Sequence, residues 1–131
     1  MGNLKEVRRA LANGADVNGR GMFEKTCLMV AVDGANEPLV SLLLQQPGIQ
    51  VNAKDKLGWT ALHYAAKGRK VIKLLLNFAG IDTEHTNFPG TTPLMYAERL
   101  GNKIFVEEYQ KKVNDDKARA VEGAQKLRRV K

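Results

Sequence analysis

Residues 58–66, Gly58-Trp59-Thr60-Ala61-Leu62-His63-Tyr64-Ala65-Ala66 (GWTALHYAA), contain the pattern that decides the fold. Similar blocks start at Thr26 (TCLMVAV) and Thr92 (TPLMYAE), so three blocks begin 34 and 32 residues apart. Each block is followed by apolar residues at helical spacing, and turn-rich links separate the units. A period close to 33 residues, with helix, turn and helix in each unit, predicts a protein of stacked helical repeats.

Over residues 2–110 the sequence resembles the ankyrin-repeat family, whose motif is Thr-Pro-Leu-His-x-Ala. The resemblance implies an all-α solenoid of stacked helix-turn-helix units with β-turn tips. We expect a repeat domain over 1–112, formed by a half repeat at about 2–18 and repeats at about 19–52, 53–84 and 85–112. The half repeat lacks a first helix. The charged residues Arg9 and Glu108, which replace leucine at one inward position, predict that the array ends near both termini.

The threonine and histidine of the motif have a structural role in this interpretation. A threonine hydroxyl can cap a helix start, and a histidine one turn later can lock the turn and bond toward the next unit. The motif residues retained here are Thr26, Thr60, His63, Thr92 and Pro93. Met29 and Met95 replace the histidine in the other two units, which predicts softer joints there.

A catalytic or metal-binding role for His63 is the alternative. The chain has one other histidine, His85, in a turn region, and no Cys-x-x-Cys or His-Glu-x-x-His pattern completes a site. No phosphate-cradling glycine loop or nucleophile with a matching base is present either. The sequence therefore predicts a protein that is not an enzyme and needs no cofactor or metal.

The central unit departs from the repeat pattern. Residues 67–70 are two residues shorter than the corresponding stretch 33–38, which predicts a tighter turn between the helices and a shortened first helix. This Lys67–Lys70 cluster carries three positive charges, and its simplest interpretation is a solvated face.

The turn tips are unusually apolar. Turns favour Gly, Asn, Asp and Ser, and a contiguous exposed apolar strip marks a binding site. The candidate partner-binding residues at tip positions are Met22, Phe23, Lys25, Lys56, Leu57, Trp59, Phe88 and Thr91. Trp59 is the leading candidate, because aromatic anchors dominate interface energies. Alternatively, Met22 and Phe23 fold back over the incomplete first unit.

A second set of candidates lies on the adjacent helix faces: Asp33, Tyr64, Lys67, Tyr96, Arg99 and Leu100. Tyr64 and Tyr96 occupy matching places in successive units. They either form an aromatic row that, beside Lys67 and Arg99, suits an acidic peptide with apolar anchors, or they pack between units.

The excess positive charge is concentrated in the tail. Residues 111–131 hold eight basic and three acidic residues, which is +5 of the formal +7. For the segment 113–131 we expect either a capping helix that begins at Asn114 or Asp115, or disorder. The basic run 126–131 could instead contact phosphates or act as a nuclear-localisation signal.

Two function classes follow. The favoured one is a monomeric, non-catalytic protein-interaction module that binds a partner protein or peptide, with an acidic surface as one option, through its turn tips and concave helix face. The alternative is binding of nucleic acid or acidic lipid by the basic tail and the Lys67–Lys70 cluster. A single cysteine, Cys27, and the lack of a membrane-length apolar run predict a cytoplasmic location, with the nucleus as the alternative.

Overall fold

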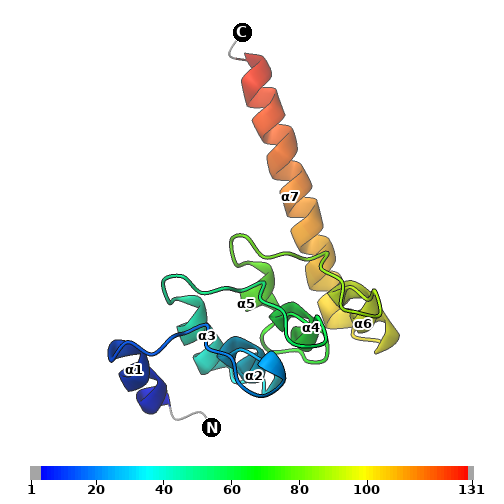
Figure 1. Ribbon diagram of the computed structural model, residues 1–131. Coiled ribbons are helices and arrows are strands. Elements are labelled where there is room, and N and C mark those ends of the chain that lie inside the picture. The colour runs from blue at the N-terminus through cyan, green and yellow to red at the C-terminus, as the bar shows by residue number, and fades with distance from the viewer. Residues whose placement is uncertain (1–3, 130–131) are drawn as a thin grey trace.

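The computed structural model describes residues 4–129, so the first two residues of the predicted half repeat and the last two of the tail lie outside the described residues. Three helical pairs follow a single N-terminal helix and stack side by side (Figure 1). The elements are α1 (Leu4–Ala12), a short 3-10 turn η1 (Met22–Glu24), α2 (Cys27–Asp33), α3 (Glu37–Leu44), α4 (Ala61–Ala65), α5 (Ile72–Leu76), α6 (Pro93–Arg99) and α7 (Lys103–Arg129). No strand occurs within this described range, and the fold is an all-α solenoid.

The first helix of each pair packs on the first helix of the next, and a single apolar core runs through the stack. Helix α4 lies between α2 and α6, and α5 packs against α7. The core consists of the Leu, Val, Ile and Ala residues on the inner helix faces, with Phe105 and Tyr109 of α7 at its C-terminal end. At the other end, Leu4 and Val7 of α1 cover it in part. No described helix is both long enough and apolar enough to span a bilayer.

The repeated threonines begin the first helix of each pair. Thr26 Oγ1 accepts a hydrogen bond from the Met29 N–H at 3.3 Å, and Thr92 Oγ1 accepts from the Met95 N–H at 3.2 Å. In the central unit the histidine shares this task, since His63 Nδ1 accepts from the Thr60 N–H at 3.1 Å. These bonds satisfy backbone donors that a helix start leaves unpaired.

The shortened central unit has shorter helices, as expected from its missing residues. Helix α4 has five residues, whereas α2 and α6 have seven each. Asn36 caps α3, but Val71 precedes α5 without a side-chain cap. The turn is held from the next unit instead, because Asn102 Nδ2 donates to the Ala66 and Gly68 carbonyls at 2.7 and 2.8 Å.

Asparagines connect the loops between units. Asn18 Nδ2 donates to Gly48 O at 2.8 Å, while its Oδ1 accepts from the Gln50 N–H at 2.8 Å. Asn52 makes the same pair of bonds, both at 2.8 Å, to Gly80 O and the Asp82 N–H. In the last unit the matching residue is Glu84, whose carboxylate accepts a bond from the Tyr109 hydroxyl of α7. This series of hydrogen bonds between successive loops therefore ends on α7.

The tail differs from both expectations. Helix α7 continues without a break from Lys103 to Arg129, so the expected boundary at 112/113 lies inside a helix. Asn114 and Asp115 occupy helix-interior positions and begin no new helix, because α7 has already started after Asn102, whose Oδ1 accepts from the Phe105 N–H at 3.3 Å. Beyond Val113 the side chains described, 114–127, are exposed, and the helix extends away from the stack without capping it (Figure 1).

Candidate partner-binding surface

Each turn tip is a small hairpin, and in the second and third units one side chain holds the hairpin by hydrogen bonds to its backbone. In the second unit the Asp55 N–H donates to Trp59 O at 2.9 Å, and Asp55 Oδ1 accepts from the Leu57 and Trp59 N–H groups at 2.9 and 3.0 Å. Asn87 serves the third unit in the same way, with its Oδ1 accepting from the Thr91 N–H at 3.0 Å. Side-chain acceptors of this kind hold a turn against its own backbone.

The first tip lacks this support. Gly21 stands where the others have Asp55 and Asn87, so no side-chain acceptor is available. Where the other tips have Gly58 and Gly90 at φ 81° and 85°, the first has Glu24 at φ 60°, and Phe23 also has a positive φ of 57°. Non-glycine residues are strained in this left-handed region. The backbone of the first tip is therefore the most strained of the three.

Backbone hydrogen bonds connect the three tips into a continuous row. The Lys56 N–H donates to Phe23 O at 2.9 Å, and the Phe88 N–H donates to Leu57 O at 3.2 Å. Arg20 also connects the first and second tips, since its guanidinium donates to the Glu24 and Lys54 carbonyls. A row tied in this way is preorganised, which lowers the entropy cost of binding.

The row presents apolar side chains to solvent. Met22 is 78% exposed, Phe23 60%, Leu57 60% and Phe88 76%, and we call these four residues the tip row. Met22 and Phe23 therefore do not fold back over the incomplete first unit. Among the tip candidates, Lys56 is also exposed, whereas Lys25 is half-buried with its ammonium 5.2 Å from the centre of the Tyr64 ring.

Trp59 lies at the foot of the tips inside an aromatic cluster. Its ring centre is 5.2 Å from that of Tyr64, 5.0 Å from Tyr96 and 5.7 Å from His63. Trp59 and Tyr96 are both half-buried, so part of each side chain is already used inside the protein. This packing reduces the surface area that Trp59 can offer a partner. The tip row has more exposed apolar surface.

Two of the candidate residues are not on the surface. Tyr64 is buried, and its hydroxyl donates to the carboxylate of Asp55; burial, followed by this bond, raises the pKa of Tyr64. Thr91 is also buried, because its N–H is bonded to Asn87 and its carbonyl lies 2.8 Å from His63 Nε2. Of the two alternatives for the tyrosines, packing between units therefore holds for Tyr64, and the expected partner contact at Thr91 is wrong.

Of the remaining helix-face candidates, Lys67 lies over the same Tyr64 ring as Lys25, with its ammonium 5.3 Å from the ring centre. Lys67 forms a 2.6 Å ion pair with Asp33, joining the first and second units. Leu100 is 51% exposed and lines a hollow of about 290 Å³ with Lys67, Arg69, Lys103 and Ile104, at the turns between helices. Arg99, which precedes Leu100 in the chain, is also exposed. The exposed sequence candidates thus include an apolar tip row and a basic hollow at the helix turns.

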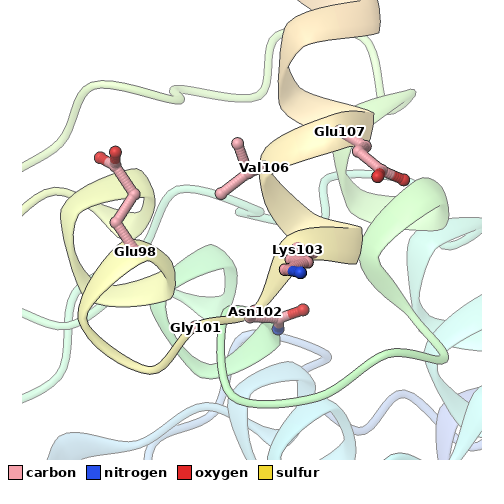
Figure 2. Close-up of a pocket in the computed structure, with 6 residues that line it drawn as sticks. All are labelled: Glu98, Gly101, Asn102, Lys103, Val106 and Glu107. Carbon is pink, nitrogen blue, oxygen red and sulfur yellow. The ribbon is translucent and has the colours of Figure 1, made fainter.

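The open C-terminal face of the stack holds a hollow that the sequence interpretation missed. It has about 370 Å³ and is lined by Glu98, Gly101, Asn102, Lys103, Val106 and Glu107 (Figure 2). Glu98 matches the fully buried Ala66 of the central unit, and Met95, 41% exposed, matches the buried His63. Comparing residues that face the next unit, instead of those that face inward, would have revealed this polar end.

The side chains that most often carry chemistry are either dispersed or used inside the fold. Over residues 4–129, no group of three His, Cys, Asp or Glu side chains is placed to hold a metal ion. His63 is used internally, between Thr60 and Thr91. Burial, as the largest cause, lowers the pKa of His63, which favours the neutral ring with its Nε2–H donating to Thr91 O.

Comparison with known proteins gives a consistent result. A family model described as ankyrin repeats (3 copies) matches residues 1–87 and 28–115. A putative ankyrin repeat protein of Acanthamoeba polyphaga mimivirus is 37% identical over 81 residues, covering 60% of this chain and 11% of that protein. Ankyrin repeat domain-containing protein 63 of Mus musculus is 39% identical over 90 residues, covering 63% of this chain and 22% of that protein.

A longer but weaker match is neurogenic locus notch homolog protein 1 of Xenopus laevis, 32% identical over 118 residues, which covers 82% of this chain and 5% of that protein. The chain spans less than a quarter of each of these three relatives. The similarity therefore concerns the repeats and not the relatives as whole proteins.

Proposed function

Because the chain belongs to the ankyrin-repeat family, whose repeats generally mediate protein–protein interaction, we propose that it is a non-catalytic module that binds a partner protein or peptide through the tip row. The observation that carries the proposal is the exposure of four large apolar side chains on turns that are already tied together. Exposed apolar groups at turn tips cost solubility unless a partner covers them.

The charges around the tip row favour a partner with acidic groups beside its apolar anchors. Arg20, Lys54 and Lys56 are exposed near the tips, and Glu24 is the exposed acidic residue among them. Charges at the rim of an interface mainly accelerate association and select the partner, while central apolar anchors supply most of the affinity. Binding should therefore persist in high salt, with a slower association rate.

The experiment is affinity capture from nuclease-treated lysate at low and high salt, followed by titration of the captured protein in purified form. A Leu57→Ser, Phe88→Ser double variant should weaken the measured affinity by about tenfold or more. Met95→Ser, which removes an exposed apolar side chain of α6 outside the tip row, is the control and should bind as the wild type does. Equal affinity of all three proteins would reject the tip row as the binding site.

A second candidate function rests on the basic hollow. Arg69 and Lys103 line it without ion-pair partners among the described residues, which supports binding of a nucleic acid or an acidic lipid. Phosphate contacts release counterions, so that binding would fall steeply with salt, unlike binding by the tip row. We place either activity in the cytoplasm or nucleus, because the single Cys27 suits a reducing compartment. Localisation of a fluorescently tagged chain tests this.

A further inference from the structure

The basic hollow lies between the interhelical turns of two successive units. The shortened α4–α5 turn contributes Lys67 and Arg69, and the α6–α7 turn contributes residues 100–104. Asn102 joins the two turns, because its Nδ2 donates to two carbonyls of the α4–α5 turn, at 2.7 and 2.8 Å. The walls of the hollow are therefore held together before a ligand arrives, which lowers the entropy cost of binding.

The hollow has an excess of positive charge. Lys67, Arg69 and Lys103 line it, and its lining includes no acidic residue. Lys67 is paired with Asp33, but Arg69 and Lys103 form no ion pair with any residue that the structure describes. Ile104, which also lines the hollow, has a backbone N–H without an acceptor among those residues. Unpaired cations beside a free N–H favour an anionic ligand.

The two unpaired cations favour a phosphate monoester over a carboxylate. A phosphate monoester carries about two negative charges near neutral pH and offers three acceptor oxygens. A guanidinium can contact two of these oxygens at once, and an ammonium acts as a compact point charge. Arg69 and Lys103 supply one group of each kind from the two turns. A carboxylate, with a single charge, would neutralise only one of them.

The surroundings of the hollow indicate that the phosphate belongs to a peptide. A second hollow shares Gly101, Asn102 and Lys103 with the basic one, but it is lined by Glu98 and Glu107 (Figure 2). Neither glutamate forms an ion pair within the described part of the chain. These carboxylates would repel the consecutive phosphates of a nucleic acid or an anionic membrane surface. A peptide can place a basic side chain beside them instead.

We propose that the basic hollow binds a phosphoserine or phosphothreonine of a partner peptide, with basic residues of the same peptide beside Glu98 and Glu107. Leu100, which is 51% exposed and lines the basic hollow, contacts an apolar residue next to the phosphorylated one. The proposal takes the hollow of the second candidate function, names a phosphopeptide in place of a nucleic acid or lipid, and does not depend on the tip row.

The first test is fluorescence anisotropy with labelled peptides at about 150 mM salt, where weak surface electrostatics are screened. Two probes contain one phosphoserine, an adjacent leucine and a pair of arginines, in opposite chain directions, and each has an unphosphorylated counterpart. At least one phosphopeptide should bind about tenfold or more tightly than its counterpart. Equal affinity within both pairs overturns the proposal.

The other sources of phosphate form the second arm of this test. A single-stranded DNA oligonucleotide and vesicles that contain phosphatidylserine are measured at the same salt concentration. Both should bind more weakly than the phosphopeptide, because Glu98 and Glu107 disfavour extended anionic surfaces. If either binds as tightly as the phosphopeptide or more tightly, the proposal fails and the second candidate function is supported.

Two double variants locate the site. Arg69→Ala with Lys103→Ala removes two cations of the hollow, whereas Lys54→Ala with Lys56→Ala removes two exposed cations near the tips. The dissociation constant of the phosphopeptide should rise at least about tenfold for the first and less than about threefold for the second. Far-UV circular dichroism checks that both chains keep their helix content. Similar losses for the two variants contradict the proposal.

A measurement on the unaltered chain does not depend on how the variants fold. When the phosphopeptide is titrated into the full chain, the backbone amide NMR signals of Arg69, Lys103 and Ile104 should shift, and those of Leu57 and Phe88 should stay in place. Shifts that avoid the hollow overturn the proposal. If those shifts fall on Leu57 and Phe88, the peptide binds the tip row and the proposed function is supported instead.

Discussion

At the scale of single residues, His63 makes the most consequential contacts in the stack. Its Nδ1 accepts from the Thr60 N–H, 3.1 Å away, and its Nε2 lies 2.8 Å from Thr91 O, so that one ring caps α4 and joins two units. Only the neutral ring can do both, since a protonated Nδ1 has no lone pair to accept.

This geometry predicts that stability falls in mild acid. Burial lowers the pKa of His63 below its ordinary value of 6.5, an effect increased by His85 and opposed by the bond to Thr91 and by Asp55. The folded state thus binds fewer protons than the unfolded state below about pH 6.5, and the free energy of unfolding decreases as the pH falls from there toward the folded-state pKa.

Urea unfolding between about pH 8 and pH 5.5, above the range in which most carboxylates titrate, measures the effect. His63→Gln should be less stable at pH 8 and show a flatter pH dependence. His85→Gln, which changes the neighbouring ring 6.3 Å away, should retain most of the dependence. The assignment to His63 fails if the two variants exchange these behaviours.

Glu24 offers a stabilising substitution. It occupies the place of Gly58 and Gly90 at φ 60°, where a side chain is strained. Glu24→Gly should raise the free energy of unfolding by about 1 kcal/mol. Glu24→Ala removes the same carboxylate but keeps the strain, so its stability should stay near that of the wild type. Equal gains in urea unfolding for both variants would show that charge, and not backbone strain, limits the first tip.

At the scale of elements, the central helix pair depends on its neighbour. Helix α5 has no side-chain cap, and the α4–α5 turn is bonded to Asn102, the residue that also caps α7. One side chain therefore replaces the stabilisation that the two missing residues of the turn would have provided.

Asn102→Ala should accordingly cost more than loss of an ordinary cap. It removes the cap of α7 and leaves the Ala66 and Gly68 carbonyls without their side-chain donor, for a loss of about 2–3 kcal/mol in the free energy of unfolding. Asn36→Ala removes only the cap of α3 and should cost about 1 kcal/mol. Similar losses for the two variants in chemical unfolding would mean that the bridge contributes little.

At the scale of the whole molecule, the stack is most protected in its middle. The central unit contacts neighbours on both sides, whereas α1 buries none of its residues and the far part of α7 is exposed. Repeat arrays of this kind gain stability from interfaces between neighbouring units. The ends should open first.

Amide hydrogen exchange followed by mass spectrometry tests this order. Peptides from α4 and α5 should exchange most slowly, those from α1 and from residues 114–129 fastest, and those from α2, α3 and α6 at intermediate rates. Uniform protection along the stack would indicate that the array unfolds as one unit.

Several features of this protein were determined by the sequence itself, because they depend on residues close together in the chain. The repeat period, the caps at Thr26 and Thr92, and the short α4 all follow from spacing within one unit. The apolar character of the tips was also readable, since turn positions can be aligned between units. The interaction-module function was inferred from the family resemblance. Neither the sequence pattern nor this resemblance identifies the partner.

Other features were decided only by tertiary structure, because they depend on contacts between distant segments. Tyr64 is a surface candidate in the sequence, but in the structure it is buried and its hydroxyl donates to Asp55 on the tip. Thr91 is buried because its carbonyl bonds to His63, which is 28 residues away. Asn102 bridges 34 to 36 residues back to the shortened turn. Helix α7 continues through the expected boundary because Tyr109 and Val113 seat it on the stack. Local pattern sets which helices form, and packing between units decides which side chains remain for a partner.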